Sequence, residues 1–195
     1  MIQVSTDFVF DGGKEEPYVE LDATNPINVY GQSKLLGEAK VLSACPDAIV
    51  TRVSWVFGPD KPGFPEWLVG QVREKERVGV PEDKVACPSY SIDYATLVEP
   101  LLTGPPPPDG ILHLCNAGAT SWFSYAEHIV EVLRDLGQSL ALRELEPTRS
   151  AQVQNFVAPR PLRTAMEIDA YQSHTGREVP PWRDAVRRHF EGMFA

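Results

Sequence analysis

Residues 48–57, AIVTRVSWVF, form an almost continuous apolar run that Gly58-Pro59 ends. A run of this length, rich in β-branched residues, predicts a β-strand. A strand with one solvent-exposed face would alternate between apolar and polar residues. The continuous apolar run therefore indicates burial on both faces, as in a parallel sheet. This strand therefore indicates an α/β fold with a parallel sheet.

Strand and helix patterns alternate on both sides of this run. Residues 2–10 and 111–116 are predicted strands, and residues 140–145 alternate in the manner of a strand. The predicted helices, spaced by their apolar residues and caps, cover about 29–45, 65–78, 93–102, 124–136 and 182–193. Two details are specific: Ser124-x-x-Glu127 matches a capping box, and Pro100 is expected to kink or end its helix. The alternation predicts an α/β chain with a parallel, doubly wound sheet.

Composition restricts the class of protein. The chain has 195 residues, a formal charge of −9 and 43% hydrophobic residues, which describes an ordinary globular domain and argues against a nucleic-acid partner. Its three cysteines form no CxxC pair, and the sequence shows no long apolar run. We therefore expect a cytoplasmic protein with reduced thiols and no membrane association. His113 and Cys115 share one face of a strand without a second ligand pair, so no metal site is predicted.

The pattern that suggests chemistry is Tyr30-Gly-Gln-Ser-Lys34 at the start of a predicted helix. Residues four apart on a helix lie on one face, which places an ammonium near a phenol. A nearby cation favours the phenolate, so such a tyrosine can exchange a proton with a carbonyl or an alcohol. The Thr6 hydroxyl, near the end of a strand, could donate a second hydrogen bond to the same oxygen. Each of these residues also has a purely structural alternative. Tyr30 and Lys34 could be spaced by chance on a surface helix, and the Thr6 hydroxyl could only complete the hydrogen bonds of a turn. Trp55 could be an ordinary core residue.

Several motifs together resemble the extended short-chain dehydrogenase/reductases, and within them the dTDP-4-dehydrorhamnose reductase family. The resemblance runs from residue 2 to the last helix. Its motifs are residues 5–12 (STDFVFDG), 29–35 (VYGQSKL), 52–58 (RVSWVFG), 110–114 (GILHL), 120–126 (TSWFSYA) and 158–161 (APRP). Two departures leave the substrate's exact identity open: Phe8 stands where relatives often carry Tyr, and Cys87-Pro-Ser89 replaces a more usual Pro-Thr pairing.

The resemblance implies hydride transfer from NADPH or NADH to a 4-keto sugar nucleotide, most specifically dTDP-4-dehydrorhamnose. It implies catalytic roles for three residues: Tyr30 as the proton donor, Lys34 as its partner and ribose ligand, and Thr6 on the keto oxygen. The resemblance implies that the cofactor is bound by Ser5, Tyr30, Lys34 and Ser54. It implies that the substrate is bound by Asp7, Trp55 and Arg160.

The resemblance also implies that a segment is missing. No GxGxxG or GxxGxxG occurs in the 195 residues, although the family carries its dinucleotide fingerprint on the first strand–helix turn. We therefore expect a C-terminal fragment of a Rossmann-like domain that binds cofactor weakly and is inactive alone. Residues 1–137 would hold the partial sheet with interleaved substrate-binding segments, and residues 138–195 a small α/β substrate-binding portion. The strand at 2–10 would be an exposed edge that pairs with another chain, as in a homo-oligomer, or aggregates.

Two other functions stay open. The first is a non-catalytic regulatory subunit that resembles the β subunit of methionine adenosyltransferase, which has the same fold. The presence of Thr6, Tyr30 and Lys34 does not favour that hypothesis. A related sugar-nucleotide epimerase or dehydratase is the other alternative. Dehydratases of this kind carry acid–base residues after the threonine, and here Asp7 fits that pattern while Phe8 does not.

Overall fold

The centre of the fold is a small parallel sheet in the order β1-β2-β7. The computed structural model describes residues 1–60, 62–153 and 158–195. The three strands are β1 (Ile2–Thr6), β2 (Ile49–Val53) and β7 (Ile111–His113). All five residues of β2 are buried, because the strand has a neighbour on each side and helices above and below. The prediction of a parallel strand buried on both faces is confirmed.

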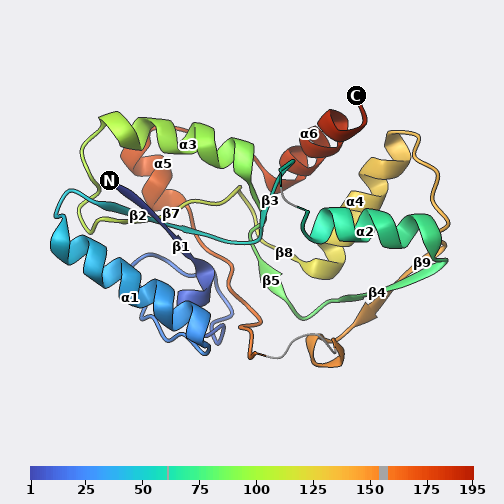
Figure 1. Ribbon diagram of the computed structural model, residues 1–195, viewed down its shortest axis with the longest axis horizontal. Helices are drawn as coiled ribbons and strands as arrows, with labels where there is room; N and C mark the ends of the chain where they lie inside the picture. The colour runs from blue at the N-terminus through green and yellow to red at the C-terminus, as the bar shows by residue number, and fades with distance from the viewer. Residues whose placement is uncertain (61, 154–157) are drawn as a thin grey trace.

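Helices cover both faces of this sheet (Figure 1). One of them packs against β1 and β2 from one side, and the other two lie on the opposite side, in the arrangement of a doubly wound fold. They are α1 (Val29–Ala44) on the first side and α3 (Ser91–Thr103) and α5 (Asp169–Thr175) on the second. Their apolar side chains and those of the sheet form one hydrophobic core, around Phe10, Ile49, Leu112 and Tyr171.

A second lobe lies beside the sheet at the carboxyl ends of its strands (Figure 1). It contains the helices α2 (Phe64–Glu74), α4 (Trp122–Asp135) and α6 (Trp182–Phe194) and the parallel pair β4 (Arg77–Pro81) and β9 (Glu144–Thr148). Its own core forms around Leu68, Ile129, Val186 and Phe190. Two short strand pairs connect the lobes: β3 (Val56–Phe57) with β6 (Ser89–Tyr90), and β5 (Val85–Ala86) with β8 (Thr120–Ser121).

Two predicted strands are shorter than expected. The strand at 2–10 ends at Thr6, whose side-chain oxygen accepts from the Phe8 N–H and caps the 3-10 turn η1 (Asp7–Val9). The strand at 48–57 is interrupted at Trp55, which has a φ of 41°. In both places the chain leaves the sheet at its carboxyl edge, where a binding site is expected in an open α/β fold.

Other element boundaries also differ from the predictions. The helix predicted over 65–78 ends at Glu74, since Val78 belongs to β4, and its Trp67 side chain is half exposed. Pro100 lies within α3 in its last turns, where its fixed φ suits a helix and one backbone hydrogen bond is lost. Helix α4 is capped by Ser121, whose hydroxyl accepts from the Ser124 N–H, so the capping box predicted at Ser124 is wrong.

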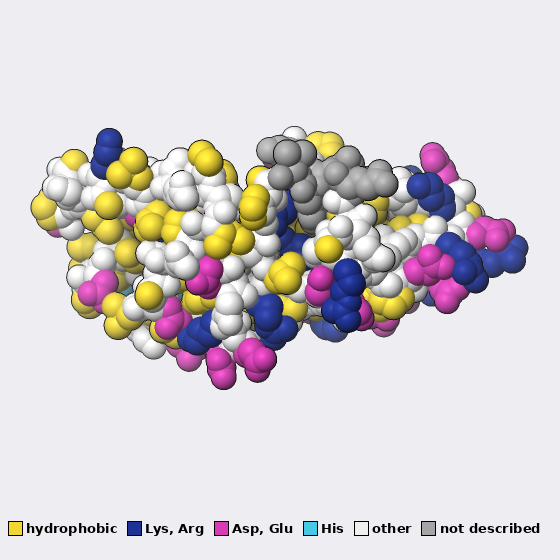
Figure 2. Space-filling view, turned by 90° about the horizontal axis from the view of Figure 1, so that it is seen from below, with side chains coloured by type: hydrophobic (Ala, Val, Ile, Leu, Met, Phe, Trp, Pro, Cys, Tyr) yellow, Lys and Arg dark blue, Asp and Glu magenta, His cyan; other side chains and the backbone are white. Residues whose placement is uncertain are grey.

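Two further regions differ from the predictions. The strand predicted at 140–145 is displaced to Glu144–Thr148, and the short helix α5 was not predicted. In Figure 2 apolar side chains are frequent over the end that carries α1, and charged ones gather at the opposite end. At that end, exposed ion pairs join β4 and β9, as between Arg77 and Glu146 at 2.8 Å. Within the described part of the chain, no helix has the length and apolarity needed to cross a membrane.

Candidate active site

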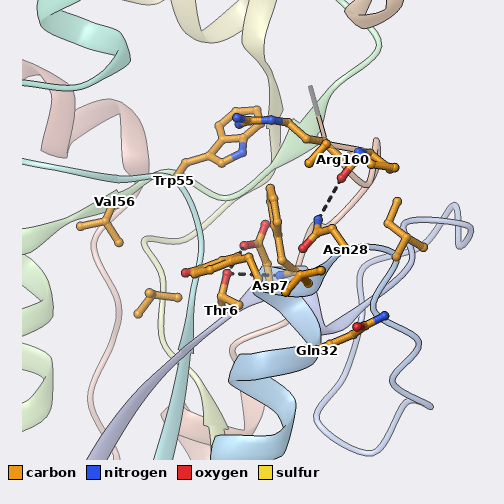
Figure 3. Close-up of a pocket in the computed structure, with 14 residues that line it drawn as sticks. Thr6, Asp7, Asn28, Gln32, Trp55, Val56 and Arg160 are labelled. Atoms are coloured by element: carbon orange, nitrogen blue, oxygen red, sulfur yellow. Dashed lines mark hydrogen bonds between the residues drawn. The ribbon is translucent and has the colours of Figure 1, made fainter. Parts of the chain in front are cut away.

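A pocket of about 730 Å³ opens at the carboxyl ends of β1 and β2. Its walls come from four segments distant in the sequence: the η1 turn after β1, the start of α1, the break at Trp55 and Val56, and residues 158–160. Figure 3 shows labelled residues of these segments converging on one space. The fold thus places a cavity where parallel-sheet proteins bind their ligands.

Thr6 and Asp7 form the floor of this pocket. The Thr6 hydroxyl accepts a hydrogen bond from the Phe8 N–H at 3.2 Å and donates one to Asp7 Oδ1 at 3.0 Å. A hydroxyl has one hydrogen and two lone pairs, and its hydrogen can rotate to another acceptor. Thr6 can therefore redirect its donor to a ligand oxygen that enters the pocket.

Asp7 is a buried carboxylate held by three hydroxyl groups. Besides Thr6, Ser54 Oγ donates to Asp7 Oδ2 at 2.9 Å and Thr164 Oγ1 donates to the same oxygen at 2.5 Å. Burial raises the pKa of Asp7, and the three hydrogen bonds together with the charge of Lys84 oppose that rise. The carboxylate links β1, the end of β2 and the segment near Thr164, so the pocket floor has a single well-defined geometry.

Lys84 lies behind the pocket and is 2% exposed. Its ammonium donates to the Pro161 carbonyl at 3.3 Å and stands 5.6 Å from the Phe8 ring and 5.4 Å from the Trp122 ring. Burial lowers the pKa of Lys84 to about 8, while the charge of Asp7 acts in the opposite direction. A buried amine near a buried carboxylate places opposite charges beneath the pocket floor.

Tyr30 projects from the first turn of α1 and lines the pocket. Its ring is half exposed and meets the Phe8 ring edge to face at 5.8 Å. The next residue, Gly31, packs so closely on η1 that an added Cβ would lie 2.1 Å from the Phe8 carbonyl oxygen. The glycine of the Tyr-Gly-x-x-Lys motif therefore permits the approach that brings Tyr30 to the same pocket as Thr6.

Lys34 lies one helical turn from Tyr30 and is not part of the pocket lining. Its ammonium donates to the Val4 carbonyl of β1 at 3.3 Å. This contact holds the side chain between α1 and the edge of the sheet. The phenol and the ammonium thus share one side of the helix, as the spacing predicts.

Trp55 and Arg160 also line the pocket. Trp55 adopts the left-handed backbone region, which costs a non-glycine residue roughly 1–3 kcal/mol and is typical of functional sites. Arg160 extends toward Trp55 from the segment after Pro159 (Figure 3). Asn28 fixes that segment: it caps α1 by accepting from the Gly31 N–H at 2.8 Å and donates to the Pro159 carbonyl at 2.9 Å.

Ser5 and Ser54, predicted beside a cofactor, are both buried and do not line the pocket. The Ser5 hydroxyl donates to Glu38 of α1, and the Ser54 hydroxyl donates to Asp7. The structure therefore brings Thr6, Asp7, Tyr30, Trp55 and Arg160 into one pocket and leaves Ser5, Ser54 and Lys34 behind its walls. Within the ranges that the structure describes, no group of His, Cys, Asp or Glu residues could hold a metal ion.

Three residues of the site were not predicted from the sequence. Asn28 could have been found, because an asparagine directly before a helix is a common N-cap. Lys84 and Thr164 carry no local signal. Nothing in their neighbouring residues indicates that the charge of Lys84 acts on Asp7, 77 positions away, or that Thr164 donates to Asp7, 157 positions away.

Comparisons with known proteins identify the family of this chain. The family model "RmlD substrate binding domain" matches residues 1–194. Among curated relatives, the dTDP-4-dehydrorhamnose reductase of Escherichia coli K12 is 30% identical over 199 residues, which cover 100% of this chain and 66% of that protein. The enzyme of the same name from Sinorhizobium fredii is 31% identical and covers 96% of this chain and 64% of that protein.

A solved structure is also similar over the whole chain. The dTDP-4-dehydrorhamnose reductase of Bacillus anthracis, crystallised in complex with NADP, superposes with a TM-score of 0.86 and 26% identity, over 98% of this chain and 64% of that one. The chain thus spans 64–66% of the length of these relatives.

Proposed function

This chain belongs to the RmlD substrate-binding domain family, and from that membership we propose that it carries the catalytic side of an NAD(P)H-dependent reductase of 4-keto sugar nucleotides. The most specific substrate we propose is dTDP-4-dehydrorhamnose, which would be reduced to dTDP-rhamnose. One observation supports this proposal above the others. Thr6 from β1 and Tyr30 from α1 line the same pocket, with Lys34 one helical turn behind Tyr30.

The residues present fit a nicotinamide cofactor by the chemistry of their donors. The Tyr30 phenol and the Thr6 hydroxyl line one pocket. The Lys34 ammonium, four residues from Tyr30, contacts the edge of β1 that does not pair with β2. In the proposed enzyme Lys34 and Tyr30 would hold the nicotinamide ribose, and Ser5 and Ser54 would shape the wall beside the ring. When bound, the reduced cofactor supplies the hydride for the keto carbon.

Tyr30 is the proposed acid. Its phenol proton passes to the keto oxygen as that oxygen becomes an alkoxide, and the resulting phenolate is stabilised by the ammonium of Lys34. The tyrosine is half exposed and lies at the first turn of a helix, so its hydroxyl is accessible to a ligand in the pocket. Proton transfer of this kind contributes roughly 10²- to 10⁴-fold to a rate.

Thr6 and Asp7 are proposed to position the same oxygen. The Thr6 hydroxyl would turn its hydrogen from Asp7 to the keto oxygen and stabilise the negative charge that develops there. Asp7 keeps Thr6 in place through its contacts with Ser54 and Thr164. Asp7 would also accept from a sugar hydroxyl, since a carboxylate offers about four lone-pair directions.

Trp55 and Arg160 are proposed to bind the rest of the substrate. An indole face is a common platform for a sugar ring, and a guanidinium matches the geometry of a diphosphate through paired N–H donors. Both side chains line the same pocket as Tyr30. The three free thiols of the structure fit the cytoplasmic location that we propose for this reaction.

The test compares three proteins in an assay of NADPH and NADH oxidation with dTDP-4-dehydro-6-deoxy sugars. They are this chain, this chain joined to the portion of the Escherichia coli relative that it does not match, and the joined protein with Tyr30→Phe. We expect turnover by the joined protein and a decrease in kcat of at least about 100-fold on removal of the phenol. A joined protein that folds and binds cofactor, yet reduces no keto sugar, would overturn the proposal.

A further inference from the structure

One buried charge has no part in the proposed mechanism. Lys84 is 2% exposed and directly precedes β5, and its backbone carbonyl accepts from the Trp122 N–H at 3.0 Å. Lysine is almost never fully buried, because the transfer of an ammonium out of water is costly. Buried titratable groups beside a cleft are concentrated at functional sites. Lys84 does not line the pocket, so a role in the site must act through its neighbours.

Two of these neighbours are aromatic rings that contact pocket residues. The Lys84 ammonium lies 5.6 Å from the centre of the Phe8 ring and 5.4 Å from that of Trp122, within the range of cation–π attraction. The Phe8 ring meets the Tyr30 ring edge to face at 5.8 Å. The Trp122 ring lies 5.6 Å from the ring of Trp55. One ammonium thus attracts the two rings that pack against the proposed acid and against the indole of the pocket.

The third neighbour is the segment that carries Arg160. The ammonium donates to the Pro161 carbonyl at 3.3 Å, and Pro161 directly follows Arg160. Phe8 belongs to η1 and Trp122 begins α4, so the three contacts come from segments that are far apart in the sequence. They meet at one charge, and each segment carries or contacts a residue that lines the pocket.

We propose that Lys84 is a positioning residue, whose ammonium keeps these three segments in the arrangement that the reaction in the pocket requires. The inference rests on the proposed function, because that reaction is the one proposed for this pocket. The charge is essential to the role. A charge-assisted hydrogen bond is about twice as strong as a neutral one. A neutral amine, moreover, has no cation–π attraction to either ring.

The same contacts make this role depend on pH. Burial lowers the pKa of Lys84 to about 8, and the charge of Arg160 acts in the same direction. The carboxylates of Asp7, in η1, and of Asp83, the preceding residue, act in the opposite direction. Lys84 is therefore charged at pH 7, and the ammonium contacts are lost as the pH rises through about 8.

The first test follows the tryptophan fluorescence of this chain between about pH 6 and pH 10. We expect a change with a midpoint near pH 8, because the charge near the Trp122 ring disappears there. Lys84→Gln keeps an N–H donor and removes the charge, so the change should be absent from this variant. Raising the pH removes the same charge from the wild type, whose fluorescence therefore tests the inference even if Lys84→Gln does not fold.

Two controls show which group causes the fluorescence change. Tyr30→Phe removes another titratable group near the same rings and should keep the change. Lys75→Gln removes an exposed lysine charge at the end of α2 and should keep it as well.

The second test measures kcat of the joined protein described above, with and without Lys84→Gln. A displacement of about 1 Å can cost about 100-fold in rate, so kcat should fall about 10- to 100-fold at pH 7. The ratio of the two kcat values should approach 1 at about pH 9.5, where the wild-type amine is neutral as well. A side chain that only fills space would give the same ratio at every pH. Lys75→Gln should keep the wild-type kcat.

The outcomes separate this inference from the proposed function. If Lys84→Gln keeps the wild-type kcat in an active joined protein, the inference is wrong and the proposed function stands. The inference is also wrong if the fluorescence change is absent from the wild type or present in a folded Lys84→Gln. If the joined protein binds cofactor and reduces no keto sugar, the proposed function fails, and the fluorescence of this chain decides separately whether the charge of Lys84 acts on the pocket walls.

Discussion

At the scale of single residues, the site depends on one carboxylate that several distant side chains share. Asp7 accepts from Thr6, Ser54 and Thr164, and it lies in a position where burial raises its pKa. Each hydroxyl that donates to Asp7 stabilises its ionised form. The orientation of Thr6, and with it the proposed contact to the keto oxygen, therefore depends on residues that do not touch the substrate.

Thr164→Val tests this arrangement with a change of nearly equal volume. The variant removes one donor to the ionised Asp7, so the free energy of unfolding should fall by about 1.5–3 kcal/mol near neutral pH. The hydrogen bond from Thr164 lowers the pKa of Asp7, so its removal penalises the ionised form more than the protonated form. The loss of stability should therefore shrink as the pH falls and Asp7 is protonated in the folded protein.

Urea denaturation at several pH values measures this effect. Thr103→Val, at the exposed end of α3, is the control and should change the stability by less than about 0.5 kcal/mol. A loss that is the same at pH 4 and at pH 8 would show that Thr164 does not act through the charge of Asp7.

The motif residues and their partners differ in how far they could be predicted. Tyr30 and Lys34 are four positions apart on one helix, so their common side follows from helix geometry alone. Thr6 was expected at a strand end, and the structure places it there. The contact of Thr164 with Asp7 spans 157 residues and depends on how the segment after residue 158 returns to the sheet.

At the scale of elements, α1 is attached to the sheet by a buried ion pair. Glu38 accepts from Arg52 of β2 at 2.8 and 3.1 Å, and it also accepts from the Ser5 hydroxyl of β1. Both charged side chains are only 3% exposed. Glu38 and Gly31 are the only described residues of α1 that are fully buried, so this contact holds the helix that carries Tyr30.

Glu38→Gln should therefore be strongly destabilising. The change leaves the buried Arg52 guanidinium without its paired carboxylate, and removing one partner of a buried pair costs roughly 3–5 kcal/mol. Glu99→Gln is the control, because its pair with Arg177 is exposed and should contribute less than about 1 kcal/mol. Thermal or chemical denaturation of the two variants measures the difference. Equal effects would show that the buried pair does not anchor α1.

The ends of the elements were predicted less well than their existence. Helices α1 and α6 begin at the predicted residues, because their apolar spacing is regular and local. The strand at 48–57 was predicted as one element, yet it breaks at Trp55. Periodicity cannot reveal a left-handed residue inside an apolar run, because the backbone angle is imposed by the contacts of the neighbouring loops.

At the scale of the whole molecule, the edge of the sheet is the feature most open to other chains. Within the described residues β1 pairs with β2 alone, and Val4 in its middle is 44% exposed. An apolar strand edge offers unpaired N–H and C=O groups to another strand. The pairing or aggregation predicted for residues 2–10 remains a prediction, as does the division into segments 1–137 and 138–195.

Val4→Lys should reduce self-association of the purified chain. A lysine on an edge strand opposes pairing because it places a charge against the incoming chain. Leu102→Lys, which replaces another exposed apolar residue, on α3, should have little effect. Light scattering or sedimentation over a range of concentrations measures the result. Strong protection of the Val4 amide from hydrogen exchange in a dilute monomer would contradict the open-edge interpretation.

The core around β7 should make the whole fold sensitive to acid. His113 is fully buried, its Nδ1–H donates to the Glu167 carbonyl at 3.2 Å, and its Nε2 has no partner among the residues described. Burial, helped by the charge of Arg52, lowers the pKa of His113 to about 3. The unfolded chain binds a proton at this residue below pH ~6.5, whereas the folded protein does not.

Stability should therefore fall as the pH decreases from about 6.5 to about 3, by up to about 5 kcal/mol from this residue. Denaturation curves over that range measure the slope. His113→Asn should be less stable at pH 7 because packing is lost, yet its stability should depend less on pH. His174→Asn, in the last turn of α5 and only partly buried, should keep the wild-type slope. An unchanged slope in His113→Asn would exclude His113 as the acid-sensitive group.

The sequence by itself determined the features that depend on nearby residues: the alternation of strands and helices, the two-sided burial of β2, and the spacing of Tyr30 and Lys34. These features follow from the periodic spacing of apolar residues, which can be recognised within a few turns of a helix or a few residues of a strand. Only the tertiary structure decided which distant side chains meet. The donors around Asp7 and the contacts of the Lys84 ammonium exist because separate segments pack together, and no local pattern specifies that packing.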